Sequence, residues 1–289
     1  MLGQNVAGYW LCKGPPGKPV DPAECDIVIY YLHGGGYVSG HAGSFLPGAL
    51  RIAEIAAERE ITLSFFGLEY SLAPETKFPA QVEEVVAGYK YLLDDQKIDA
   101  SKIAVLGNSA GGHLALCLIA SLHGYQLPKP GKGLFLKSPW IDLECSKRAR
   151  YEDNKYTDYV SLSALVKSSK DLLGKATGKD AIEFVDFTQP LSGGISWKDV
   201  MPNRVWLSAG SHELLLHDIE EFSRCLEKDG VNAEFEVEPG GVHSWQGVKD
   251  AWDKPKYLKS TERPLAEGMM LGTAVIGNAI LSVAGPTST

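Results

Sequence analysis

The amino-acid sequence predicts an α/β fold with a doubly wound, mainly parallel central sheet and a small helical lid. Between residues 27 and 140, short apolar runs alternate with segments of helical periodicity, which is typical of parallel strands covered by helices on both faces. Most of these runs are apolar throughout, as buried strands are. Gly-rich turns follow two of them, where such sheets carry their sites. The length of 289 residues suits a single domain spanning residues 1–289.

The individual elements follow from hydrophobic periodicity. Continuous apolar runs predict buried strands, and apolar residues repeated every three or four positions predict helices. The alternating run 233–238 predicts a half-exposed strand near the sheet edge. In chain order we expect strands over 6–12, 27–32, 61–68, 103–106, 133–140, 203–210 and 233–238, and helices over 46–60, 81–94, 112–121 and 219–229.

Two segments fall outside this alternation. Residues 1–25 contain a turn region rich in proline and glycine, and residues 141–200 are polar with helix-prone patches. We expect 1–25 and about 145–200 to form a lid above the sheet. Plain surface helices would give the same pattern over 145–200, so the two interpretations stay open at this point.

The apolar segment 269–284 resembles a membrane span only superficially. It is short, rich in small residues, and broken by Thr273, Asn278 and Ser282. The G-x-x-x-G pair formed by Gly268 and Gly272 is a weak signal in so short a stretch. We therefore expect a C-terminal helix docked on the sheet and no membrane span.

Composition excludes several classes of partner. The net charge of −8 and the lack of a Lys/Arg-rich run argue against nucleic acid. No signal peptide is visible at the N-terminus, and the cysteines have no metal-type spacing, so we expect a cytoplasmic protein with free thiols and no metal or organic cofactor. A homodimer is compatible with the sequence. The five cysteines are Cys12, Cys25, Cys117, Cys145 and Cys225.

The most informative motif is G-x-S-x-G, formed by Gly107, Ser109 and Gly111. An ordinary Gly-rich turn would match so short a pattern. Here, however, the motif lies between a buried strand and a helix of small residues, which is the setting of a nucleophile elbow. Such a turn strains the serine backbone and exposes the hydroxyl, while the amide of Ala110 points to the same place at a helix N-terminus.

A serine nucleophile needs a base and an orienting acid. In doubly wound hydrolases these follow the serine in the order acid, then histidine, on loops after core strands. His243 lies after the last expected strand and is the candidate base. Two residues compete as the acid: Glu213 lies three residues past the strand end at Gly210, and Asp218 falls in the first turn of the following helix. We expect Glu213 to be the acid, because it is nearer the strand end.

A second Gly-rich loop, His33 to Gly36, follows the buried strand 27–32 directly. Glycine amides are unobstructed by any Cβ and can converge on an oxyanion. A flexible linker is the alternative, but linkers rarely follow an apolar strand so closely.

Taken together, these motifs resemble the hormone-sensitive-lipase-like family of α/β-hydrolases, the α/β-hydrolase-3 esterases. The resemblance implies an α/β-hydrolase fold and a serine carboxylesterase with Ser109 as nucleophile and His243 as base. It also implies an oxyanion hole formed by the amides of Gly35, Gly36 and Ala110, with Gly34 as a further possibility. The matching stretches are His33–Gly36, Tyr70–Glu75, Phe78–Ala80, Gly107–Gly112, Ser138–Asp142 and Gly241–His243.

The sequence departs from the family pattern in several places. Asn108 stands where the family usually has Asp, which should change the local charge and leave the elbow intact. Ser71 replaces a usual Arg and so removes an ion pair, and Glu213 replaces a usual Asp. The N-terminal segment is short, so two interpretations stay open: the cap that family members build from N-terminal helices is reduced, or the sequence is a truncated form.

The expected function is hydrolysis of small, largely apolar carboxylic esters through an acyl-enzyme intermediate, with a small-molecule ester as partner. Tyr37, Trp140 and Trp245 lie near the motifs and are expected to line the substrate pocket, unless each simply packs the core. Three enzyme alternatives keep the fold: an amide or formamide hydrolase, an acyltransferase, and a dehydratase of secondary metabolism. The non-enzyme alternative is a ligand receptor, which would have no need of a triad.

Overall fold

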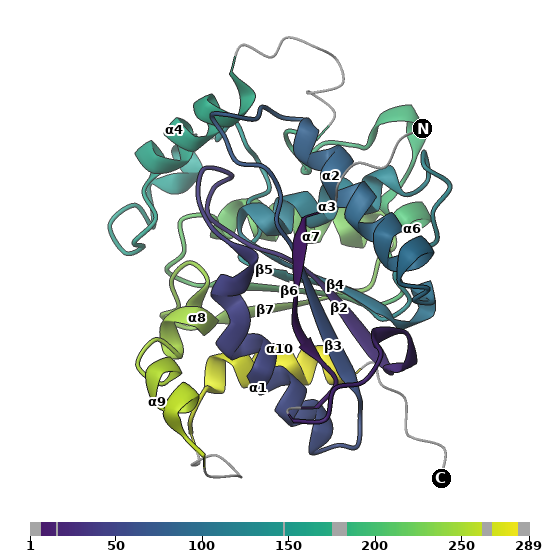
Figure 1. Ribbon diagram of the computed structural model, residues 1–289. Coiled ribbons are helices and arrows are strands. Elements are labelled where there is room, and N and C mark those ends of the chain that lie inside the picture. The colour runs from purple at the N-terminus through teal and green to yellow at the C-terminus, as the bar shows by residue number, and fades with distance from the viewer. Residues whose placement is uncertain (1–6, 16, 147, 175–183, 262–267, 283–289) are drawn as a thin grey trace.

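A seven-stranded sheet forms the centre of the molecule in the computed structural model, which describes residues 7–15, 17–146, 148–174, 184–261 and 268–282 (Figure 1). The strand order is β1-β3-β2-β4-β5-β6-β7, and all neighbours are parallel except β1 and β3. This confirms the predicted mainly parallel sheet. The strands are β1 Gly8–Lys13, β2 Ile27–Leu32, β3 Leu63–Leu68, β4 Ile103–Asn108, β5 Gly133–Lys137, β6 Val205–Gly210 and β7 Ala233–Glu238.

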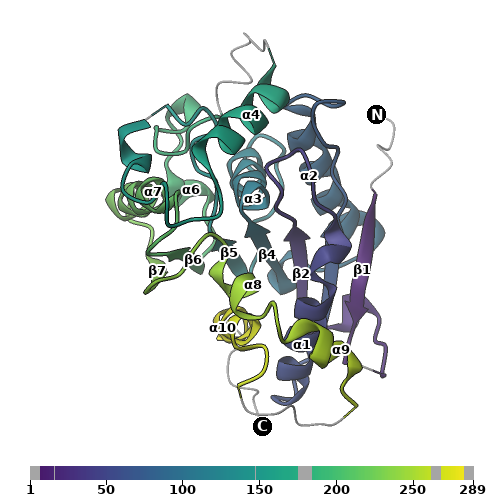
Figure 2. The same cartoon turned by 90° about the vertical axis from the view of Figure 1, so that its left-hand side faces the viewer.

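Helices cover both faces of the sheet (Figures 1 and 2). Helices α2, α3 and α7 lie on one face, and α1 and α10 lie on the other. The α-helices are α1 Leu46–Ala57, α2 Ala80–Lys90, α3 Ala110–Ser121, α4 Leu162–Leu173, α6 Trp197–Val200, α7 Leu216–Lys228, α8 Trp245–Lys249, α9 Lys254–Lys259 and α10 Leu271–Leu281.

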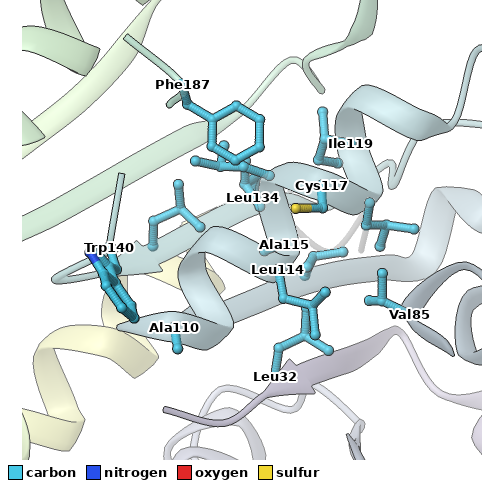
Figure 3. Packing of buried hydrophobic residues seen from close by; sticks show 14 of the residues in the cluster. Leu32, Val85, Ala110, Leu114, Ala115, Cys117, Ile119, Leu134, Trp140 and Phe187 are labelled. Carbon is cyan, nitrogen blue, oxygen red and sulfur yellow. The ribbon is translucent and has the colours of Figure 1, made fainter. Parts of the chain in front are cut away.

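The core consists of two apolar clusters, one on each face of the sheet. Side chains alternate across a strand, so Ile103 and Val105 of β4 join one cluster while Ala104 and Leu106 join the other. The first cluster packs between the sheet and α2, α3 and α7. Figure 3 shows part of it around α3, whose residues 110–119 are buried on every side. This helix is apolar all round because it lies beneath other elements.

The structure corrects the expectation that residues 1–25 belong to a lid. Residues 8–13 form β1, an edge strand that pairs antiparallel with β3. The physical reason is the apolar side of β1: the ring of Trp10 packs 5.2 Å from that of Phe66 on the neighbouring strand. Residues 1–6 of this segment lie outside the described residues.

The segment 145–200 behaves differently. Its described residues add no strand to the sheet, and α4 lies beyond the carboxyl ends of the central strands (Figure 2). Ser161 caps the N-terminus of α4: its hydroxyl accepts a hydrogen bond from the amide of Ala164 at 3.2 Å. Residues 175–183 lie outside the described residues. The placement of α4 is compatible with a lid.

The C-terminal helix α10 packs on the sheet face that also carries α1. Ile276 and Ile280 are fully buried in the second apolar cluster. The carboxylate of Asp250 accepts hydrogen bonds from the amides of Gly272 and Thr273, at 2.8 and 2.7 Å, and so fixes the start of the helix. In the described part of the chain, every helix is too short or too polar to cross a membrane.

Candidate active site

The strand-to-helix turn after β4 has the geometry of a nucleophile elbow. Ser109 adopts φ 54° and ψ −120°, a strained conformation for a residue with a side chain. The turn is closed by tight packing: a Cβ on Gly107 would lie 2.5 Å from the carbonyl oxygen of Gly111, and a Cβ on Gly111 would lie 2.1 Å from that of Leu32. Both glycines are therefore required for the helix to start so close to the strand.

Three side chains from distant parts of the sequence meet at this turn. The Nε2 atom of His243 lies 2.8 Å from Oγ of Ser109, and its Nδ1 atom lies 2.9 Å from Oε1 of Glu213. Glu213 is fully buried, and His243 and Ser109 are 5% and 8% exposed. A carboxylate that accepts a hydrogen bond from Nδ1–H fixes the tautomer in which Nε2 is free to accept the proton of the serine hydroxyl.

Glu213 is held by groups at the ends of two neighbouring strands. Its Oε2 atom accepts a hydrogen bond from the amide of Gly210, at the end of β6, at 2.9 Å. The same atom accepts one from the hydroxyl of Ser138, just past β5, at 2.8 Å. The other carboxylate oxygen, Oε1, faces His243. Both oxygens therefore have hydrogen-bond partners, which explains how the longer Glu side chain fits where the family usually has Asp.

The other candidate acid, Asp218, is not brought to His243. It lies in the first turn of α7, as expected, but its side chain is buried against a different partner. The hydroxyl of Tyr151 donates a hydrogen bond to its Oδ2 atom at 2.5 Å. Asp218 thus ties α7 to the segment 145–200.

The glycine loop after β2 lies beside Ser109. A Cβ on Gly34 would lie 3.2 Å from Cβ of Ser109, which places the loop against the elbow. No described residue accepts a hydrogen bond from the amide of Gly35 or Gly36. Ala110 is the first residue of α3, where an amide has no acceptor within its own helix. Unpaired amides beside a nucleophile are suited to a developing oxyanion.

A cavity of about 340 Å³ opens above Ser109 and His243. Helix α4 and the residues before it cover one side, and the glycine loop forms the other. Its walls are largely apolar. The lining residues are Gly35, Gly36, Val38, Ser39, Asn108, Ser109, Tyr159, Val160, Ala164, Leu165, Ser168, His243 and Ser244.

Tyr37, Trp140 and Trp245 do not line this cavity, which corrects the expectation from sequence. All three are at most 3% exposed. The hydroxyl of Tyr37 pairs with His113 at 2.8 Å, and the indole N–H of Trp245 donates to Ser208 at 2.9 Å. Trp140 packs among core side chains near the start of α3 (Figure 3). These three residues are close to the motifs in the sequence, but that closeness does not show that their rings point into the core.

Sequence reasoning missed the residues that hold the acid and base loops together. The carboxylate of Asp158 accepts hydrogen bonds from the amide of Leu214 at 2.8 Å and from the amide of His243 at 3.1 Å. Next to it, the ring of Tyr159 packs edge-on against His243 with centroids 6.1 Å apart. Asp158 accepts its hydrogen bonds from backbone amides, and no sequence motif or spacing predicts which amides a carboxylate will contact.

Asn108 also forms a hydrogen bond that links the elbow to a neighbouring loop. Its Oδ1 atom accepts a hydrogen bond from the hydroxyl of Ser244 at 2.8 Å, so it links the elbow to the loop of the base. The amide of Ser244 in turn donates to the hydroxyl oxygen of Ser138 at 2.8 Å. The neutral side chain of Asn108 is therefore used as a hydrogen-bond acceptor at the elbow.

Known proteins share both the sequence pattern and the fold. A family model described as the alpha/beta hydrolase fold, Abhydrolase_3, matches residues 29–247. An acetyl-hydrolase of Streptomyces hygroscopicus is 28% identical over 273 residues, which cover 90% of this chain and 84% of that protein. An esterase of Acinetobacter venetianus is 28% identical over 232 residues, covering 80% and 71%.

Solved structures agree. An esterase from the bacterial hormone-sensitive lipase family superimposes with a TM-score of 0.74 at 28% identity, covering 99% of this chain and 87% of that chain. The structure of EstE5 soaked with p-nitrophenyl butyrate gives a TM-score of 0.74 at 26% identity, covering 98% and 83%. The chain therefore belongs to the α/β-hydrolase-3 family, of the alpha/beta hydrolase fold, and is an esterase-type carboxylic ester hydrolase.

Proposed function

We propose that the protein hydrolyses small, largely apolar carboxylic esters through an acyl-enzyme formed on Ser109. The observation that carries the proposal is the continuous chain of contacts from Ser109 through His243 to Glu213, at 2.8 and 2.9 Å. The unpaired amides of Gly35 and Gly36 beside it supply the second element that acyl transfer needs.

In the first half of the reaction, Oγ of Ser109 attacks the ester carbonyl carbon while its proton moves to Nε2 of His243. The carbonyl oxygen becomes an oxyanion, which the amides of Gly35, Gly36 and Ala110 stabilise. Glu213 stabilises the imidazolium that forms. When the tetrahedral intermediate collapses, the bond to the alcohol oxygen breaks, and His243 gives its proton to the leaving alcohol.

The second half repeats these steps with water as the nucleophile. His243 takes a proton from water, and the hydroxide attacks the acyl carbon. The same amides hold the second oxyanion. Collapse breaks the bond to Oγ of Ser109, which recovers its proton from His243, and the carboxylic acid leaves.

The cavity above Ser109 supports small substrates. Its volume of about 340 Å³ is at the lower end of the range for ligand pockets. Val160, Ala164 and Leu165 give it an apolar wall and leave no charged side chain opposite the nucleophile in the described lining. These side chains favour acyl or alcohol groups of a few carbons over charged or long ones. Because they come from the segment 145–200, we propose that this segment is the lid.

The function is tested with p-nitrophenyl esters of increasing acyl length, together with N-formyl and N-acetyl amides and a fluorophosphonate label. We expect turnover to be highest on short acyl chains, far lower on the amides, and absent in Ser109→Ala, which should also lose labelling. Amide turnover above ester turnover would replace the ester assignment by an amidase. Labelling that persists in Ser109→Ala would overturn the nucleophile, and a wild-type protein with no turnover or labelling would favour a receptor.

A further inference from the structure

A second cavity of about 310 Å³ lies behind the glycine loop, on the face of the sheet that carries α1 and α10. It shares only Gly35, Asn108 and Ser244 with the cavity above Ser109, so these residues form the wall between the two. Among its other lining residues are Tyr31, His33, Phe45, Lys137, Lys254 and Ile276.

Lys137 occupies a position on β5 where the strand pattern calls for an apolar residue. Leu134 and Leu136 join the core cluster under α3, and Phe135 joins the one under α1 and α10. Alternation places Lys137 on the same face as Phe135, and the side chain is only 3% exposed. A lysine this deeply buried is rare unless it is paired.

The structure provides no such pair. No described residue forms a hydrogen bond or ion pair with Nζ of Lys137, which lies 5.0 Å from the ring centroid of Phe45. None of the described residues lining the cavity is acidic, and Lys254 lines it as a second ammonium group. The neighbouring carboxylate of Asp250 is already used by the amides of Gly272 and Thr273.

Elsewhere in the lining, one buried polar atom lacks a hydrogen-bond partner among the described residues. The imidazole of His33 contacts the carbonyl oxygen of Gly34 through Nδ1 at 2.8 Å, while its Nε2 atom is buried without a hydrogen-bond partner among the described residues. Buried unpaired polar groups cost stability and are concentrated at functional sites. The cavity therefore contains an ammonium group without a direct hydrogen-bond or ion-pair partner among the described residues, and an imidazole nitrogen that is not used.

We propose that this cavity is a binding site for a small organic carboxylate, whose anionic group pairs with Lys137 and whose apolar part lies against Tyr31, Phe45 and Ile276. Lys254 adds a second positive charge to the lining. Because the wall residues Gly35, Asn108 and Ser244 also border the catalytic cavity, the occupant sits next to the esterase site without entering it. The site is independent of the Ser109 chemistry.

The size and the walls of the cavity favour an organic carboxylate over an inorganic anion. A volume of about 310 Å³ is much larger than phosphate or sulfate needs and is at the lower end for organic ligands. The apolar side chains of Tyr31, Phe45 and Ile276 would be poorly matched to an ion that is charged on all sides. A carboxylate with a short alkyl or aryl body satisfies both the cation and these walls.

The site is tested by isothermal titration calorimetry with acetate, butyrate, phenylacetate and phosphate, and with neutral phenylacetamide. We expect phenylacetate to bind the wild-type protein at least tenfold more tightly than phenylacetamide or phosphate. Lys137→Met should weaken phenylacetate at least tenfold, and Lys228→Met, which removes an exposed lysine of α7, should not change it. Ser44→Trp, which fills the rim of the cavity but keeps Lys137, should also abolish binding.

Two further variants separate this cavity from the catalytic one. Ser109→Ala should bind phenylacetate as the wild-type protein does, because Ser109 does not line the second cavity. Ala164→Trp, which narrows the catalytic cavity, should leave the affinity unchanged. The proposal is overturned if no carboxylate binds the wild-type protein, or if Lys137→Met binds phenylacetate as tightly as the wild-type protein does. It is also overturned if Ala164→Trp abolishes phenylacetate binding while Lys137→Met and Ser44→Trp do not. Equal affinity for phenylacetamide would also contradict it.

Discussion

The hydroxyl of Ser138 donates a hydrogen bond to Oε2 of Glu213 at 2.8 Å and accepts one from the amide of Ser244 at 2.8 Å. One side chain thus links the proposed acid, Glu213, to the loop that carries the proposed base, His243. The backbone of Ser138 has φ 44°, so the chain turns sharply as β5 ends and aims the hydroxyl at the carboxylate. The acid is therefore oriented from β5 as well as from its own strand, β6.

The choice of acid is tested by a matched pair of amide substitutions. Glu213→Gln removes the negative charge beside His243, so esterase turnover should fall by roughly 10³- to 10⁴-fold with the fold retained. Asp218→Asn should keep turnover within a few-fold and lower the thermal stability, because the hydrogen bond from Tyr151 loses its charged acceptor. The reverse pattern of rates on one p-nitrophenyl ester would make Asp218 the acid.

Asp158 should act as a positioning residue. Asp158→Ala leaves the amides of Leu214 and His243 without their acceptor, and each hydrogen bond to a charged group contributes about 1.5–3 kcal/mol. We expect kcat to fall at least tenfold while KM changes little, with partial recovery in Asp158→Asn.

The control for Asp158 is Asp153→Asn, an exposed residue of the same segment whose carboxylate contacts His217. It should leave kcat and the melting temperature nearly unchanged. If Asp158→Ala lowers only the melting temperature and keeps the rate at temperatures where it is folded, Asp158 is a stabilising residue and not a positioning one.

Sequence alone sufficed for the sheet and for the three side chains that meet at the elbow, because both depend on strong local signals. Ser109 sits in a motif whose flanking glycines are required by packing, and His243 follows the last strand. Glu213 was separable from Asp218 because a residue near a strand end reaches the catalytic edge of a parallel sheet, whereas a residue in a helix turn is carried away from it.

The substrate pocket could not be predicted in the same way. Tyr37, Trp140 and Trp245 are close to the motifs in sequence, but the rotation of each loop decides whether a ring faces the cavity or the core. The cavity above Ser109 is lined instead by Val160 and Ala164, which come from the segment 145–200. No hydrophobic periodicity in that segment indicates how it packs against the sheet. The burial of Lys137 was not predicted either, because a lysine at the end of a strand is ordinarily expected to reach solvent.

The lid is tested through the size of the catalytic cavity. Ala164 lines it from α4, so Ala164→Phe should reduce its volume and lower kcat/KM on butyrate and longer esters more than on acetate. We expect a loss of at least tenfold on the longest active acyl chain, with the melting temperature unchanged. Lys170→Phe, at an exposed position of the same helix, should not shift the preference, and an unchanged preference in Ala164→Phe would show that α4 does not bound the acyl group.

Lys137 should reduce stability at neutral pH. Burial, with a smaller contribution from Lys254, lowers the pKa of Lys137 from 10.5 to about 8. The unfolded chain binds this proton more tightly, so the lysine destabilises the folded state below pH 8, and this effect is lost as the pH rises towards 10.5. Lys137→Met should therefore raise the free energy of unfolding at pH 7 by up to about 3 kcal/mol.

That gain should shrink steadily between pH 8 and pH 10, as urea unfolding at each pH would show. The exposed Lys228→Met provides the baseline for removing a lysine. A Lys137→Met protein less stable than the wild type at pH 7 would mean that a contact of the ammonium group, such as that with the ring of Phe45, outweighs the cost of burial.

The central claim is that Ser109 carries the acyl group. Wild-type protein mixed with p-nitrophenyl butyrate and quenched in acid within the first turnovers should show an intact mass increased by one butyryl group, and peptide mapping should place it on Ser109. A burst of p-nitrophenol with an amplitude close to the enzyme concentration should precede steady turnover if deacylation is the slower step. Ser109→Ala should show neither the adduct nor turnover. Rapid turnover by Ser109→Ala, or a butyryl group mapped to another residue, would contradict the account.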